Sequence, residues 1–267
     1  MRNVGRRVVV LCYHSVHPTK SFASATPAMF GAHLNWLKHN CTVIHFTQAK
    51  NAVNHNGGTR PSVVITFDDG YADNYEYAFP LLQQYGLPAT VFLTAGLLEN
   101  DPAVVERFRS LCRSSGEDVR PLTWSQIKEM RRARMEVGAH SYSHPNLARL
   151  ERSQVQRELA QSKNILEDRL GEPVSSMAYP FGKPRVHFSV ETERLAAEAG
   201  YEQAGAVLFR TVRHSDSQFA IPRFFVANDD VDSLAGKVYG SWDFLGRWQE
   251  RAPLAITRIV SPQDFIY

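Results

Sequence analysis

The sequence predicts one α/β domain built around a parallel β-sheet. Short apolar runs alternate with helix-forming segments along the 267 residues, as in parallel strands joined by crossover helices. Several runs are continuous and rich in β-branched residues, which is typical of strands buried on both faces. Predicted helices end at Gly86, Gly171 and Gly200, shortly before the next strand. This pattern leaves open a closed or partly closed barrel and a doubly wound sheet.

The predicted elements follow one another in a regular order. The apolar runs predicted as strands cover residues 8–13, 42–46, 62–67, 89–94, 135–139, 176–179, 202–206 and 224–227. The helical patterns between them cover residues 27–38, 73–85, 125–134, 153–170 and 190–199. Thr26 followed by Pro27 is a typical helix start, because Thr caps the first turn and Pro is tolerated at the first helical position.

Composition and charge exclude several classes of protein. With 43% hydrophobic residues and a formal net charge of +3, the chain is too apolar and too weakly charged to be disordered. No motif of a nucleic-acid reader is present, and no stretch approaches the ~20 apolar residues of a transmembrane helix. The apolar run 8–13 is shorter than a typical signal-peptide core, and no cleavage site follows it. We therefore expect a cytoplasmic protein, with export as the alternative.

Cysteine and arginine usage gives two further expectations. Cys12, Cys41 and Cys112 are scattered along the chain, so no structural disulfide is predicted. Basic residues crowd the span 107–134, and two interpretations stay open for them. They form either a solvated helix face or a surface for phosphates or for peripheral contact with an anionic membrane. The sequence does not indicate an oligomeric state.

Polar residues follow several predicted strands at the point where each strand ends. Asp68 and Asp69 follow the strand 62–67, and His140 and His144 follow the strand 135–139. His14 follows the first strand. Because functional groups of parallel barrels and sheets gather at the carboxyl ends of strands, these residues predict a site at one rim.

The residue types at this rim suit a metal site with a free carboxylate. Adjacent residues that leave a strand point to opposite sides, so one of Asp68 and Asp69 can bind a metal while the other takes a proton. The spacing of His140 and His144 places two imidazoles close enough for one small cation. Three protein ligands with an open position are typical of catalytic zinc, and cobalt or nickel are alternatives. The competing interpretations are an Asp-Gly turn or helix cap and a capped histidine turn.

Three motifs together carry a family resemblance. The segments TFDDG at 66–70, HSxxHP at 140–145 and YPFG at 179–182 occur in the order found in polysaccharide deacetylases. The chain from about residue 8 to residue 228 resembles carbohydrate esterase family 4, the nodulation-factor deacetylase homology domain. The resemblance implies a distorted (β/α)7-type barrel, and we expect residues 1–239 to form this catalytic domain. Residues 240–267 carry aromatic residues without a strand pattern, so we expect a tail or helix docked on it. It also implies metal-assisted removal of an N-acetyl group from an amino sugar.

The resemblance implies roles for individual residues. Asp68 resembles the catalytic base. The metal ligands that it implies are Asp69, His140 and His144. The third motif is expected to bind substrate through Tyr179, Pro180, Phe181 and Gly182, with the Phe181 backbone N–H holding the oxyanion.

Two departures from the family pattern lead to substitute residues. Ala178 stands where the family has an Arg, and no late Leu-x-His motif supplies a general acid. His14 is the expected acid, as in the poly-N-acetylglucosamine deacetylase-like subset that this segment resembles. The alternative is that His14 only packs at a strand end. Arg223 is expected to replace the missing Arg beside Asp68 and to contribute to substrate binding, unless it is a surface charge.

The expected function is therefore metal-dependent N-deacetylation of a sugar in a bacterial surface polysaccharide or its precursor. A near-balanced charge suits a neutral sugar better than a polyanion. Two alternatives stay open. One is amide or ring-opening hydrolysis of a small non-sugar substrate, and the other is a carbohydrate-binding pseudoenzyme. The partners expected are thus an N-acetylated sugar and a divalent metal, zinc before cobalt or nickel.

Overall fold

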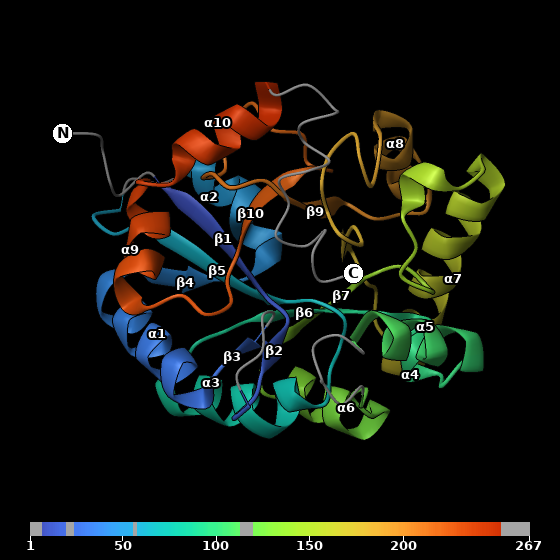
Figure 1. The fold of residues 1–267 in the computed structure, drawn as a ribbon, viewed down its shortest axis with the longest axis horizontal. Coiled ribbons are helices and arrows are strands. Elements are labelled where there is room, and N and C mark those ends of the chain that lie inside the picture. The colour runs from blue at the N-terminus through green and yellow to red at the C-terminus, as the bar shows by residue number, and fades with distance from the viewer. Residues whose placement is uncertain (1–6, 20–23, 56–57, 113–119, 252–267) are drawn as a thin grey trace.

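The computed structural model describes residues 7–19, 24–55, 58–112 and 120–251. Figure 1 shows central strands surrounded by helices, with the colour following the order of the elements along the chain. The strands are β1 (Val8–Tyr13), β2 (Ser15–Val16), β3 (Ser24–Ala25), β4 (Thr42–Ile44), β5 (Ser62–Phe67), β6 (Thr90–Leu93), β7 (Glu136–Ala139), β8 (Ser176–Ala178), β9 (Gln203–Val207) and β10 (Ile221–Phe225). The α-helices are α1 (Pro27–Asn40), α2 (Ala49–His55), α3 (Phe79–Tyr85), α4 (Ala95–Leu98), α5 (Pro102–Cys112), α6 (Trp124–Arg132), α7 (Arg152–Leu170), α8 (Val190–Glu198), α9 (Val231–Tyr239) and α10 (Asp243–Arg251). Shorter helical turns are η2 (Phe46–Gln48), η3 (Asn74–Ala78) and η4 (Leu147–Arg149).

The sheet closes on itself through its first strand. β1 pairs in parallel with β5 on one side and with β10 on the other. The order β1-β10-β9-β8-β7-β6-β5 is thus a ring of seven parallel strands. This confirms the predicted single-domain (β/α)7 barrel and excludes the open, doubly wound sheet.

The barrel is distorted where β4 joins it. β4 pairs with Ser62–Val64 at the start of β5, whereas β6 pairs with Thr66 and Phe67 at its end. β4 and β6 therefore pair with the same edge of β5, one with its first half and the other with its second half. The sheet branches at the amino end of the barrel, and the ring is complete at the carboxyl end, where the polar motifs lie.

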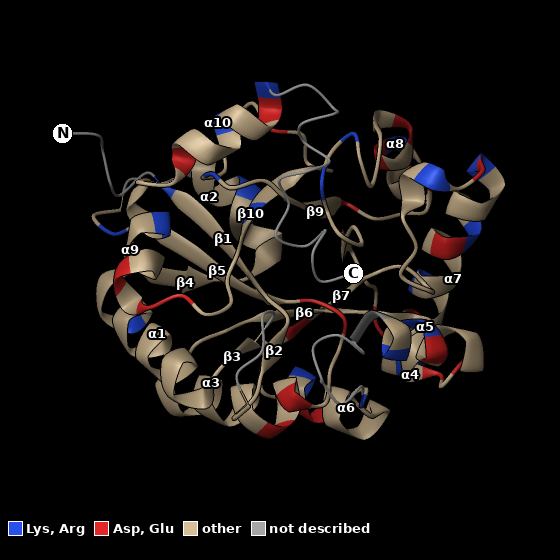
Figure 2. Ribbon diagram, viewed as in Figure 1, with Lys and Arg blue, Asp and Glu red and all other residues tan. Residues whose placement is uncertain are grey.

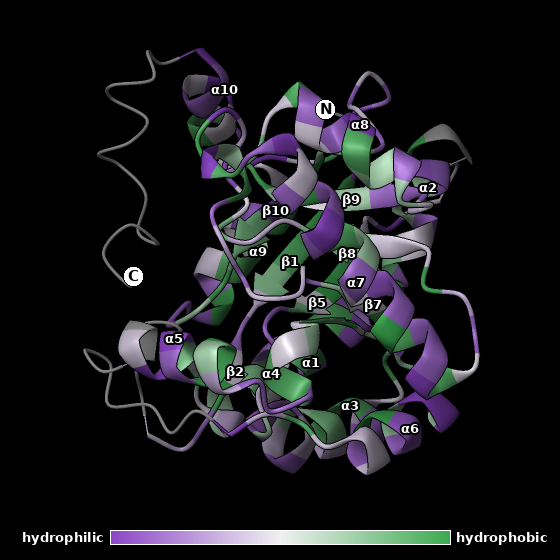
Figure 3. Cartoon of the chain, turned by 90° about the vertical axis from the view of Figure 1, so that its right-hand side faces the viewer, coloured by the Kyte–Doolittle hydropathy of each residue, from purple (hydrophilic) through white to green (hydrophobic). Residues whose placement is uncertain are grey.

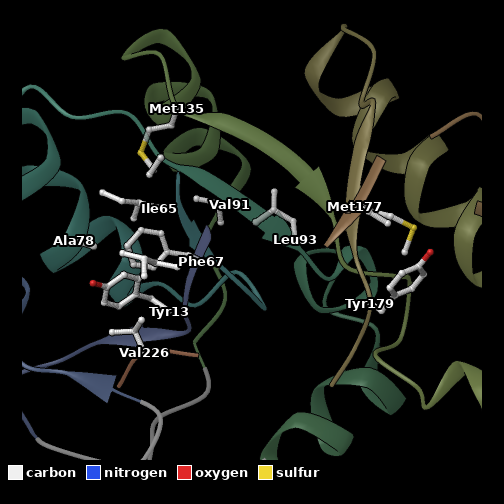
Figure 4. Packing of buried hydrophobic residues seen from close by; sticks show 14 of the residues in the cluster. Tyr13, Ile65, Phe67, Ala78, Val91, Leu93, Met135, Met177, Tyr179 and Val226 are labelled. Carbon is white, nitrogen blue, oxygen red and sulfur yellow. The ribbon is translucent and has the colours of Figure 1, made fainter. Parts of the chain in front are cut away.

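Alternation along the strands divides the core into two layers. Val8, Val10, Phe92 and Ala178 come from strands around the ring and belong to one cluster of buried residues, which fills the barrel interior. The intervening residues pack outward against the helices, and Figure 4 shows part of this layer around Tyr13, Ile65, Phe67, Val91 and Leu93. Figure 3 shows the same division, with hydrophobic strands inside and hydrophilic helix faces outside.

Charge is largely confined to the helices and loops, as Figure 2 shows. Within the basic span, Arg120 pairs with Glu76 and Arg131 with Glu172, while Arg113 lies outside the described residues. No helix in the described part of the chain is long and apolar enough to cross a membrane.

Element boundaries differ from the expectations in two instructive places. The last strand lies at Ile221–Phe225 rather than at the expected 224–227. The expected strand begins too late because Pro222 and Arg223 are uncommon in buried strands. The helix expected at 73–85 begins as the π-helical turn η3 and continues as α3. α10 lies in the segment expected as a docked tail or helix, and residues 252–267 are outside the described part.

Candidate active site

The metal-binding candidates lie in two loops at the carboxyl rim. Asp69 follows β5 with a φ of 74°, and His144 has a φ of 54° in the loop after β7. Non-glycine residues pay a cost of about 1–3 kcal/mol in such conformations, which persist where the surrounding structure fixes them. Both side chains are buried and turn toward His140, which is 1% exposed. The backbone strain thus serves to bring three separate donors together.

The three donors fit one divalent ion. His140 Nε2 lies 3.5 Å, and His144 Nε2 3.4 Å, from Asp69 Oδ1. A tetrahedral ion with bonds of about 2.0–2.2 Å holds its ligand atoms about 3.3–3.6 Å apart. His140 Nδ1 contacts the Ala178 carbonyl at 2.8 Å, which orients Nε2 toward the other donors. Two imidazoles and one carboxylate at these separations suit zinc or a similar transition metal.

Asp68 points into the barrel beside this cluster and is fixed by Arg223. The guanidinium donates to both carboxylate oxygens, from Nη1 to Oδ1 at 2.7 Å and from Nη2 to Oδ2 at 2.8 Å. Arg223 Nη1 also donates to Thr66 Oγ1 at 3.3 Å. Burial alone would raise the pKa of Asp68, but Arg223 and the neighbouring His140 hold that pKa well below its usual range. Asp68 is therefore an ionised carboxylate at neutral pH.

A glycine makes room for this arginine. Arg223 is fully buried, and its Cζ lies 5.3 Å from the centre of the Phe92 ring. A Cβ at Gly205 of the neighbouring strand would lie only 2.8 Å from Arg223 Nε. Because Arg223 lies beneath Asp68 with no exposed surface, it contacts the carboxylate rather than a substrate, so we leave it out of the substrate contacts.

His14 lies at the end of β1 on the same side of Asp68 as Cys12. Its backbone carbonyl accepts a hydrogen bond from Asn74 Nδ2 at 2.8 Å, and the centroid of its ring lies 5.3 Å from that of the Phe225 ring. Burial lowers the pKa of His14 to about 4, so the imidazole is neutral near pH 7. A ring nitrogen of His14 lies within 4.8 Å of an Asp68 carboxylate oxygen, so the side chain adjoins Asp68 and also packs at the end of its strand.

The third motif forms a turn against the metal-binding candidates. Phe181 and Gly182 have φ values of 60° and 67°, and a Cβ at Gly182 would lie 2.6 Å from Val207 Cγ2. The centroids of the Phe181 and His144 rings lie 4.7 Å apart. Pro180, which precedes this turn, is buried.

Tyr179 differs from the rest of its motif. Its ring is fully buried and stacks on Phe188 with a centroid distance of 3.9 Å, and Figure 4 shows it beside Met177. The Tyr179 side chain therefore fills the core, and we leave it out of the substrate contacts.

Sequence reasoning missed some residues around Asp68. No role at the site is predicted for Cys12, yet its Sγ donates to Asp68 Oδ2 at 3.4 Å. Its position two residues before His14 on one strand face was the available signal. The contact from Asn74 to His14 had no comparable signal, since it depends on how the loop after β5 folds over the end of β1.

A closed parallel barrel with a carboxylate and two histidines beside a second, ionised carboxylate has the make-up of a hydrolase. The chain belongs to the polysaccharide deacetylase family, whose sequence model matches residues 55–204. Membership of this family makes the chain a hydrolase of carbon–nitrogen bonds.

Individual relatives extend the match over most of the chain. YxkH of Bacillus subtilis (strain 168) is 27% identical over 239 residues, which cover 88% of this chain and 76% of YxkH. The poly-beta-1,6-N-acetyl-D-glucosamine N-deacetylase of Staphylococcus aureus (strain MRSA252) is 23% identical over 230 residues, covering 82% and 72% of the two chains. The solved structure of the deacetylase PplD of Streptococcus pyogenes, in complex with acetate, shares the fold with a TM-score of 0.72. It is 23% identical and covers 87% of this chain and 98% of its own.

Proposed function

We propose that the protein is a metal-dependent N-deacetylase that hydrolyses the acetamido group of an N-acetylated sugar in a surface polysaccharide or its precursor. The observation that carries the proposal is the cluster of Asp69, His140 and His144 next to the ionised Asp68. The similarity to a poly-N-acetylglucosamine deacetylase supports the sugar as substrate class. Asp68 and all three donors are present in this chain, which argues against a pseudoenzyme.

Asp69, His140 and His144 would hold the metal. When bound, the ion polarises the amide carbonyl and makes water a better nucleophile. The chain's own residues supply the other parts of the reaction, and zinc is the metal that we propose first because its usual ligands match this donor set.

Asp68 acts as the general base. Its carboxylate is ionised at neutral pH because of Arg223, and it lies 4.0 Å from His140 Nε2, at the edge of the donor cluster. A water beside that cluster is therefore within reach of Asp68, which takes the proton as the oxygen attacks the carbonyl carbon. The two oxygen contacts to Arg223 keep the carboxylate from rotating away.

His14 returns a proton to the leaving nitrogen. Because its imidazole is neutral near pH 7, it must first receive a proton. A ring nitrogen of His14 lies within 4.8 Å of an Asp68 oxygen, a gap that one water can bridge, and the proton taken up by Asp68 is proposed to pass through such a water to His14 and then to the amine. The Phe181 peptide N–H, in the turn packed on His144, is proposed to stabilise the oxyanion.

Acetate release across a panel of N-acetylated sugars, from nucleotide-linked monomers to oligomers, tests the function. We expect release by the metal-loaded protein, none with Asp69→Ala, and full release with Asp168→Asn, an exposed carboxylate on α7. A product heavier by one water without free acetate would instead indicate ring opening of another substrate. Sugar binding without acetate release under all metal conditions would indicate a binding protein.

A further inference from the structure

A second group of potential metal ligands lies on the other side of Asp68. Cys12, His14 and Asp68 are all buried, and their donor atoms lie within 4.8 Å of one another. They offer a sulfur, an imidazole nitrogen and a carboxylate oxygen, a set that suits zinc, cobalt and related ions. The proposed deacetylation uses Asp68 and His14 but assigns nothing to the Cys12 thiol.

The separations in this group match those around an ion. Cys12 Sγ lies 3.4 Å from Asp68 Oδ2. A tetrahedral zinc with Zn–S of about 2.3 Å and Zn–O of about 2.0 Å would hold these two atoms about 3.5 Å apart. His14 Nδ1 is buried and has no hydrogen-bond partner among the described residues. Asp68 Oδ2 accepts from Arg223 Nη2 and from the Cys12 thiol, and loss of the thiol proton on metal binding frees its second lone pair for the ion.

We propose that Cys12, His14 and Asp68 Oδ2 bind a second divalent transition-metal ion and that this ion inhibits the enzyme. The inhibition, but not the binding, rests on the proposed function, because the ion would coordinate both Asp68, the proposed base, and His14, the proposed proton carrier. The step is a simple exchange. The S–H bond of Cys12 breaks, an S–metal bond forms, and one proton leaves to solvent with no change in oxidation state.

The surroundings make this site the weaker of the two. Arg223 places a positive charge directly against Asp68, which opposes a second cation. The cluster of Asp69, His140 and His144 lies next to it, so an ion bound there adds further repulsion. The second site therefore fills after the first, and inhibition appears only when free metal exceeds the amount needed for activity.

Titration of the metal-free protein with Co²⁺, followed by absorption spectroscopy and metal analysis, tests this order. We expect two equivalents to bind, with a thiolate-to-cobalt band in the near ultraviolet that grows only with the second equivalent. Over the same range, deacetylation rises with the first equivalent and falls by about 10²-fold or more with the second, as expected for loss of a general base.

Cys12→Ser is the diagnostic variant, and Cys41→Ser is its control. Cys41 is also buried, but it precedes β4 at the opposite end of the barrel. Cys12→Ser should lose the band and the second equivalent, and its own activity at excess cobalt should equal that at one equivalent. Cys41→Ser should behave like the wild type.

The two proposals fail separately. If no acetate is released from any sugar but the band appears and depends on Cys12, the second site stands and the proposed substrate is wrong. A band that is absent at excess cobalt, or that survives in Cys12→Ser, would overturn the second site whatever the activity.

Discussion

The cluster of Asp69, His140 and His144 comes from two short loops, each following a single strand. The group around Asp68, by contrast, draws on β1, β5 and β10, and its central ion pair joins residues 155 positions apart. Spacing along the chain brings His140 and His144 together, and the pairing of β6 with β5 and β7 brings Asp69 to them, whereas the second set exists only because β1 lies between β5 and β10 in the closed ring. The proposed metal ligands thus depend on two sequence motifs on nearby strands, whereas the position of the proposed base depends on closure of the barrel.

Metal removal should give the largest difference between variants of the proposed metal ligands and variants of the group around Asp68. A chelator should abolish acetate release, and saturating metal at about 1,000 times its Kd should raise the free energy of unfolding by about 4 kcal/mol. Denaturation with and without zinc measures this change. Asp68→Asn should keep the metal-dependent stabilisation, and Asp69→Ala should lose it. Equal stabilisation of both variants would place the ion elsewhere.

Substitutions of the proton-transfer residues should lower turnover while metal content stays the same. We expect Asp68→Asn and His14→Ala each to reduce kcat by about 10²–10⁴-fold, because each removes a group that moves a proton. Steady-state kinetics with metal analysis on the same samples tests this. Activity of His14→Ala close to that of the wild type would mean that another group protonates the amine.

Breaking the ion pair should cost stability as well as activity. Arg223→Met leaves the buried Asp68 carboxylate without its guanidinium, and such losses cost about 3–5 kcal/mol. Urea denaturation should show this loss, and adding Asp68→Asn should recover part of it because the uncompensated charge is gone. If the double variant is no more stable than Arg223→Met, the charge is not the cause.

Gly205→Ala should give the smallest effect. The added Cβ would press against Arg223 Nε and Cδ, at 2.8 and 3.0 Å. We expect a loss of about 1–3 kcal/mol from overpacking and a fall in kcat with little change in metal content. Gly171→Ala is a useful comparison, since a Cβ there meets nothing within 4 Å, although its φ of 72° adds backbone strain.

The sequence was sufficient for the alternation of strands and helices and for the polar motifs at the strand ends. The pattern of strands and helices alone left barrel and open sheet undecided, because closure depends on the pairing of β1 with β10, which no local pattern encodes. The family resemblance of the three motifs predicted the barrel. Arg223 illustrates the limit. Its strand contains a proline and a charge, so the pattern indicates a strand that begins later, and only the space above Gly205 explains how a guanidinium fits inside the barrel.

Closure through β1 has a consequence for how the chain acquires its fold. The donors Asp69, His140 and His144, with β8 beneath them, are all present once residue 178 has been made, whereas β10 leaves the ribosome later. Until then Asp68 has no guanidinium beside it, and the first strand lacks one of its two neighbours. Long-range pairings of this kind form late and slowly. The nascent chain thus contains the three proposed metal ligands before Arg223 is available to hold Asp68.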